Sequence, residues 1–195
     1  MNNLTLALQW LFFFLLMGLG VYTMKVIKNE KRNYLENAQE VDFKNFKLLT
    51  PRWWTLINST ENEIVFKRTD TRYDWEARFI WNEEVSPLNL IELFQSKIHA
   101  REILFDEESS VIHNPSDFKD KDLIKSGRFE MVRLEGTATA ERMERLYYDA
   151  FLIREIESGH YLYAESKSSI LNGLVEGPYF EEVMLRLSLI DNPAI

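Results

Sequence analysis

The chain has 195 residues, of which 46% are hydrophobic and 13% aromatic, with only 7 Gly and 5 Pro. This composition excludes a wholly disordered or low-complexity chain, and the length leaves room for one ordinary domain and little else. The complete lack of Cys excludes disulfides, Cys-ligated zinc, iron–sulfur clusters and a thiol nucleophile.

The first element is an uncharged apolar segment at 4–24. As an α-helix rising about 1.5 Å per residue, it is just long enough to cross a hydrocarbon core of about 30 Å. A cleaved signal peptide is the alternative, but the preceding MNN carries no Lys or Arg, and the region 18–22 is a poor cleavage site. We therefore expect a retained, single-pass signal-anchor helix.

A basic collar follows this helix, with one acid, Glu30, among its basic residues. Its four members are Lys25, Lys28, Lys31 and Arg32. The positive-inside rule predicts that the C-terminal side faces the cytoplasm, as in a bacterial-type inner membrane, where the collar also meets lipid phosphates. An exported domain stays open as an alternative, because long domains translocate largely regardless of charge.

The charge distribution separates the anchor from the rest of the chain. Residues 1–32, the anchor with its collar, hold 4 of 23 basic and 1 of 31 acidic residues, so that the remainder holds 19 and 30, a net charge of −11. Such a domain repels nucleic acid and anionic lipid. We expect a short stalk at 33–42 and a soluble domain at 43–195.

The first half of this domain is predicted to form strands and then a helix. The expected strands lie at 46–50, 53–57, 63–68 and 75–82, with turns at 58–62 and 69–72. Ser86 is the predicted N-cap and Pro87 the first residue of the helix. Its apolar stripe contains Leu88, Ile91, Leu93, Phe94 and Ile98.

The second half repeats this order. A short strand is expected at 110–113, followed by three long strands at 127–139, 144–156 and 160–166. Short turns at 140–141 and 158–159 predict an antiparallel meander. The last helix is expected to begin at Gly177–Pro178. Its apolar face contains Phe180, Val183, Met184, Leu187 and Ile190.

Strands and helices in this order predict an α+β fold in which helices cover an antiparallel sheet. The segments TPRWW, SGRFEMVRLEGTAT, YYDAFLI, GHYLYAES and YFEEVMLRLSLI resemble the pattern of the PsbP-like and DcrB-like α/β/α sandwich proteins over about residues 43–190. That resemblance implies a binding, assembly or chaperone-like accessory module near a membrane, without catalysis. The helical anchor and the lack of Cys depart from the lipoprotein members of that group.

No motif in the chain predicts a reaction. The three histidines, His99, His113 and His160, lack the i, i+3 or i+4 spacing of paired metal ligands. The acidic loop at 117–122 resembles a calcium site only superficially, because Lys119 and Lys121 neutralise it. Nucleophile elbows and phosphate-binding glycine loops are also missing from the sequence. We expect no catalytic residue, cofactor or metal.

Tryptophans gather in the first strands of the domain. Adjacent residues of one strand point to opposite faces, so one of Trp53 and Trp54 should reach an edge or groove. If the chain binds a protein partner, we expect Trp53, Trp54 and Trp75, with the helix at Pro87, to form the site. Packing of these rings in the core is the simpler explanation of the same residues.

The predicted function is that of a membrane-anchored, non-catalytic binding or assembly module for a protein partner, without affinity for nucleic acid. Two alternatives stay open. One is a membrane-tethered hydrolase that uses carboxylates, and the other is an immunity or chaperone-like protein for a membrane-active polypeptide.

Overall fold

The computed structural model describes residues 3–68, 74–140 and 144–190, and divides into two units at Ala38/Gln39. The turn expected at 69–72 lies outside the described residues, as does Glu141 of the turn expected at 140–141.

The N-terminal unit is one helix, α1 (Asn3–Glu36), with a mean hydropathy of 1.8 over its most apolar window. It is long and apolar enough to cross a membrane, as the sequence predicted. The helix does not stop at Met24 but continues through the basic collar to Glu36. The side chains of Lys25, Lys28 and Arg32 are exposed, and that of Lys31 is not among those described.

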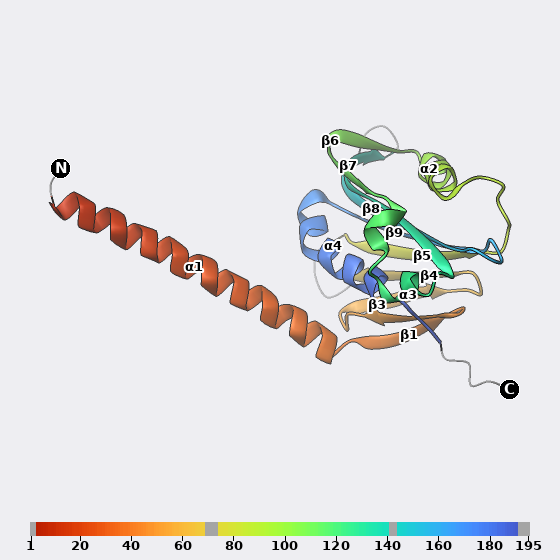
Figure 1. Ribbon diagram of the computed structural model, residues 1–195, viewed down its shortest axis with the longest axis horizontal. Coiled ribbons are helices and arrows are strands. Elements are labelled where there is room, and N and C mark those ends of the chain that lie inside the picture. Colours follow the sequence, from red (N-terminus) through yellow and green to blue (C-terminus); the bar gives the residue numbers. More distant parts are fainter. Residues whose placement is uncertain (1–2, 69–73, 141–143, 191–195) are drawn as a thin grey trace. The chain divides into compact units, whose positions relative to one another are not determined.

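The second unit contains two antiparallel sheets (Figure 1). The small sheet has the order β1 (Gln39–Phe43), β2 (Phe46–Thr50), β10 (Ser188–Leu189). The large sheet has seven strands, in the order β3-β4-β5-β9-β8-β7-β6. In chain order these are β3 (Trp54–Ser59), β4 (Glu63–Arg68), β5 (Glu76–Asn82), β6 (Ile103–His113), β7 (Phe129–Ala140), β8 (Glu144–Glu155) and β9 (Tyr161–Ser168).

Two helices cover opposite faces of the large sheet. On one face, Phe180 of α4 (Ile170–Leu185) packs against Phe151 of β8, at 5.8 Å between ring centroids. On the other face, α2 (Leu90–Ala100) packs in one buried cluster with Leu152, the next residue of β8. Consecutive strand residues point to opposite faces, so the unit is an α+β sandwich with the sheet between helices, as predicted.

The helix before β6 begins later than predicted. Its first residue is Leu90, because Asn89 caps the helix. The Asn89 side chain accepts a hydrogen bond from the Glu92 backbone N–H at 2.9 Å, and the Glu92 side chain accepts one from the Asn89 backbone N–H at 3.3 Å. The predicted cap Ser86 and first residue Pro87 therefore lie in the loop before α2.

The last helix begins earlier than predicted. It starts at Ile170 and runs through Pro178, and Ser188–Leu189 pair with β2 instead of extending the helix. The strand expected at 110–113 is also longer, since β6 starts at Ile103. Two short helical turns, a 3-10 turn (Pro115–Phe118) and α3 (Asp122–Lys125), link β6 to β7.

A glycine sets the distance between α4 and the sheet. A Cβ atom on Gly173 would lie 2.3 Å from Cβ of Tyr147 on β8, closer than real side chains approach. Only a glycine therefore allows α4 to lie this close to β8.

Candidate functional site

The predicted tryptophan site is largely part of the core. Trp54 and Trp75 are each 1% exposed, and their rings lie 4.2 Å apart. Trp75 Nε1 donates a hydrogen bond to Ser166 Oγ at 3.0 Å. Trp53 is half-buried and packs edge-on against Tyr179 at 5.0 Å. Of the three rings, only that of Trp53 reaches the surface of the domain.

A buried carboxylate on α4 joins two of these tryptophans. Glu176 is fully buried and accepts hydrogen bonds from Trp53 Nε1 at 3.2 Å and Trp54 Nε1 at 2.9 Å. It also forms an ion pair with Arg68, whose guanidinium lies 5.9 Å from the Trp53 ring centre. Trp53 precedes the first residue of β3, so strand alternation does not separate the two indoles. Both N–H groups point to the same carboxylate.

Pro87 lies in an exposed apolar patch at the start of α2. We define the α2 patch as Val85, Pro87, Leu88 and Ile91. The side chain of Val85 is 69% exposed, and those of Leu88 and Ile91 are 39% exposed. A shallow hollow of about 300 Å³ opens beside the patch, between the loop at 84–88 and Tyr161. The patch is apolar, accessible and concave enough to take a side chain of another molecule.

The structure does not bring Trp53 and Pro87 together. Trp53 contacts α4, whereas Pro87 belongs to the approach to α2, and these helices cover opposite faces of the sheet. The predicted partner-binding set therefore divides into two surfaces.

A polar groove of about 500 Å³ lies at the end of the sheet beyond α2. Two of its carboxylates are paired with cations. Glu76 pairs with Lys67 at 3.2 Å and with Arg78 at 3.3 Å. Glu165 pairs with Arg101 at 3.1 Å. Arg78 Nε donates no hydrogen bond, and its ionic partner, the Glu165 carboxylate, lies 3.8 Å away.

The electrostatics of this groove favour charged carboxylates. Burial acts to raise the pKa of Glu76, but the hydrogen bond from Lys67 and the charges of Lys167 and Arg78 outweigh it and hold this pKa below its usual value. Burial, Tyr163 and the Glu165 charge raise the pKa of Tyr148, whose hydroxyl donates to Glu165. The ion pairs hold the side chains of this groove in fixed positions. Among the described residues, no cluster of three or more His, Cys, Asp or Glu side chains could hold a metal ion.

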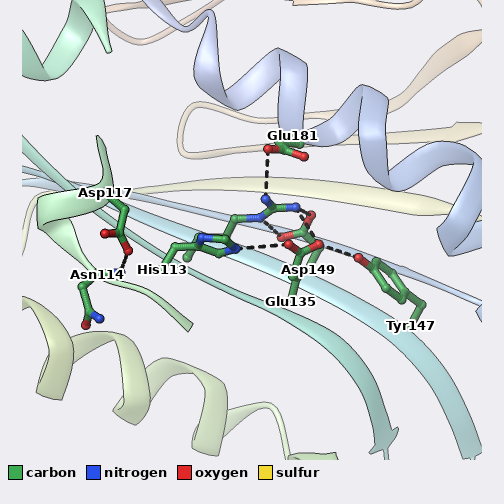
Figure 2. A network of polar contacts seen from close by, with 8 residues as sticks. His113, Asn114, Asp117, Glu135, Tyr147, Asp149 and Glu181 are labelled. Atoms are coloured by element: carbon green, nitrogen blue, oxygen red, sulfur yellow. Dashed lines mark hydrogen bonds and ion pairs between the residues drawn. The ribbon is translucent and has the colours of Figure 1, made fainter. Parts of the chain in front are cut away.

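A second network lies under α4, on the other face of the sheet (Figure 2). At its centre Arg133 of β7 binds Asp149 of β8 through two hydrogen bonds, from Nε to Oδ1 at 3.0 Å and from Nη2 to Oδ2 at 2.9 Å. The same guanidinium lies 3.2 Å from Glu181 of α4 and donates to Glu135 at 2.8 Å. Arg133 is 3% exposed and Asp149 is fully buried, so the two charges need each other inside the protein. Through Glu181, the same guanidinium links α4 to strands β7 and β8.

The carboxylates of this network outnumber its permanent cation. Burial raises the pKa of Asp149 to about 6, against the lowering effect of Arg133, and the charges of Glu135 and Glu181 add to the rise. Two further side chains reach Glu135: the Tyr147 hydroxyl donates to it at 2.6 Å, and His113 Nε2 lies 3.2 Å away. Burial raises the pKa of Tyr147 further above 10, so its hydroxyl keeps its proton and remains a donor.

The search for motifs missed this network, although the sequence contains an indication of it, namely charged residues placed among apolar neighbours in two strands. Arg133 lies between the apolar residues Val132 and Leu134 in FEMVRLEG, and Asp149 is the one charged residue of YYDAFLI. A lone charge flanked on both sides by core residues requires a partner inside the protein.

No protein-family model and no curated protein sequence matches the chain. Solved structures do resemble it. The solution structure of PsbP from the cyanobacterium Synechocystis sp. has a TM-score of 0.52 at 12% identity, over 78% of this chain and 92% of that one. The crystal structure of the Ran-binding protein Mog1p from Saccharomyces cerevisiae has a TM-score of 0.50 at 9% identity, over 80% of this chain and 96% of that one. The chain therefore has a PsbP/Mog1p-like fold, which confirms the predicted resemblance at the level of the fold.

Proposed function

We propose that this protein is a single-pass, membrane-anchored binding module for a protein partner, and that it has no catalytic activity. α1 is the anchor in this proposal, because it is long and apolar enough to cross a bilayer. Lys25, Lys28, Lys31 and Arg32 hold the acidic domain on the cytoplasmic side.

The α2 patch is the observation that carries the proposal. Four apolar residues within positions 85–91 are exposed, and three of them, Val85, Pro87 and Leu88, line a shallow hollow. Apolar side chains gathered beside a hollow are typical of surfaces that bind other proteins. Trp53, which packs against Tyr179 and donates to Glu176 on the opposite face, lies outside this surface.

The fold supports this proposal in a general way. Mog1p, which shares the fold, is described as a Ran-binding protein, so the same sandwich serves as a platform for a protein partner elsewhere. Function resides in sites rather than in folds, so the α2 patch, and not the fold, is the main support for partner binding.

The alternative of a hydrolase has one observation in its favour, namely the groove at the end of the sheet. It has the volume of a small-molecule site and contains Glu76 and Glu165. Each of these carboxylates already has a cationic partner, and a general acid needs a raised pKa, whereas that of Glu76 is lowered. The groove is better explained as a set of structural ion pairs.

The test is co-purification of the tagged full-length chain from membranes in mild detergent. The double variant Leu88→Asp/Ile91→Asp places charge in the α2 patch, and Ile112→Asp, at a residue 56% exposed on the edge strand β6, is the matched control. We expect a stoichiometric partner with the wild-type chain and the control, and its loss with the double variant. Equal recovery of that partner with all three chains, each folded by circular dichroism, would contradict the proposal.

A further inference from the structure

The first half of α4 has its apolar side chains on the outside. Leu171 is 76% exposed, Leu174 65% and Val175 45%. The face turned to the protein consists instead of small and polar residues, namely Asn172, Gly173, Glu176 and Gly177. A surface helix normally buries its apolar stripe and exposes its polar one, so this half of α4 is inverted.

The inversion is fixed by contacts on the inner face. Glu176 accepts from two tryptophan N–H groups and pairs with Arg68, and Asn172 Nδ2 donates to Asp74 at 2.7 Å. Turning the helix to bury its leucines would break these hydrogen bonds and leave the buried Trp54 N–H without its acceptor. It would also move Gly173 away from Tyr147, where no other residue fits. The leucines are therefore held at the surface.

We define the α4 stripe as Leu171, Leu174, Val175 and Pro178, and we propose that it lies in the interface of the same bilayer that α1 spans. This inference rests on the anchoring role of α1 and goes beyond the binding of a protein partner. The helix extends beyond the apolar segment to Glu36, by about 18 Å at about 1.5 Å per residue, and only Asn37 and Ala38 then separate it from β1. A domain on so short a stalk stays close to the membrane.

Charge favours a lipid of no net charge as the occupant. The nine residues 170–178 contain one ionisable group, Glu176, which is buried and paired with Arg68. The domain as a whole is strongly acidic and repels anionic headgroups, so apolar contact rather than charge has to supply the binding. Trp53 and Tyr179 pack together beside Glu176 and Pro178, and such rings are enriched at the level of lipid headgroups.

A small apolar surface is enough because the domain is already tethered. Tethering turns association into an intramolecular step with a high effective concentration of lipid. The α4 stripe would then fix the orientation of the domain at the membrane and leave the α2 patch, on the opposite face of the sheet, open to a partner.

The lack of native Cys permits a direct test. Leu174→Cys and, as control, Ile112→Cys are labelled with the environment-sensitive dye NBD, and each full chain is reconstituted into phosphatidylcholine vesicles with no other protein. For position 174 we expect blue-shifted emission and quenching by lipids spin-labelled near the headgroup, stronger than by lipids labelled deep in the chain. For position 112 we expect the emission of a dye in water and no quenching.

Each other outcome contradicts the inference in a distinguishable way. Water-like emission at position 174, in a chain that resists carbonate extraction from the vesicles, refutes lipid contact and leaves the anchor intact. Protection of position 174 only after membrane proteins are added would assign the stripe to a protein partner instead. Loss of the chain to carbonate refutes the anchor, and with it both the inference and the proposed function.

Discussion

Trp54 Nε1 donates a hydrogen bond of 2.9 Å to Glu176 Oε2, across 122 residues of sequence. This contact joins the first strand of the large sheet to α4, and it fixes the helix with its leucines outward. The same carboxylate is the sole ionisable group on the inner face of the first half of α4.

Glu176→Gln should destabilise the domain, because it removes the negative charge that binds Arg68 and two indole N–H groups while keeping the shape of the side chain. Removing one member of a buried pair costs about 3–5 kcal/mol, and we expect about 2 kcal/mol, since Arg68 is partly exposed and can reach water. A urea titration of the full chain in detergent, followed by tryptophan fluorescence, measures the change. Asp122→Asn, in an exposed pair with Lys125, is the control and should leave the midpoint unchanged. Equal midpoints for Glu176→Gln and the control would contradict this role of Glu176.

Gly173→Ala should destabilise the protein although alanine favours helices. The new methyl group would meet Tyr147 at 2.3 Å, and such overpacking costs about 1–3 kcal/mol, which exceeds the gain of about 1 kcal/mol in helix propensity. Gly177→Ala is the matched variant, because its methyl group would lie 3.3 Å from the same ring. Thermal unfolding of both variants should give the lower midpoint for Gly173→Ala. The reverse order would show that α4 does not lie this close to β8.

The stability of the wild-type chain relative to Asp149→Asn should rise on acidification from pH 7 to pH 5. The folded pKa of Asp149, about 6, lies above its ordinary value of 3.8, so burial of the charge weakens the fold above pH 6, and protonation relieves this cost as the pH falls. The relative gain should be about 1 kcal/mol. Carboxylates with lowered pKa values, such as Asp74 and Glu76, lose stabilising interactions at lower pH in both chains, and this loss cancels in the difference. A difference that stays constant between pH 7 and pH 5 would refute the raised pKa.

Exchanging the charges that flank α1 should change its orientation. Replacing Lys25, Lys28, Lys31 and Arg32 with Asn, and residues 2 and 3 with Lys, moves the positive bias to the other side of the helix. We expect the wild-type chain fused to alkaline phosphatase at its C-terminus to be inactive in that reporter and the variant to gain activity. An active wild-type fusion would place the domain on the exported side.

The sequence predicted those strands and helices that have one apolar face and one polar face. Alternation in β5, where Ala77, Phe79 and Trp81 are buried, follows the expected pattern. The predicted stripe of α2 is buried at Leu93, Phe94 and Ile98, whereas Leu88 and Ile91 are each 39% exposed. The start of α2 was misplaced because Ser86–Pro87 and Asn89–Glu92 both resemble helix starts, and only the second forms the reciprocal hydrogen bonds of a cap.

The first half of α4 could not be predicted in this way. Its segment ILNGLVEGP has two glycines and a proline, which indicate a loop, and its leucines face outward. What keeps it helical is long-range, namely the contact of Gly173 with Tyr147 and the binding of Glu176 by Trp53, Trp54 and Arg68. The burial of Trp54 and Trp75 could not be predicted either, because aromatic residues occur in strands both in the core and at binding surfaces.

Site-specific photo-crosslinking from the α2 patch tests whether this patch binds a protein partner. A photoreactive amino acid is placed at Leu88 in the full chain, in its native membrane, with Ile112 as the control position. We predict that Leu88 forms one defined, saturable adduct with a protein, and that the adduct disappears when Ile91→Asp is added. If Leu88 and Ile112 give the same pattern of adducts, or if the Leu88 adduct persists with Ile91→Asp in a folded chain, the α2 patch is not a partner-binding surface.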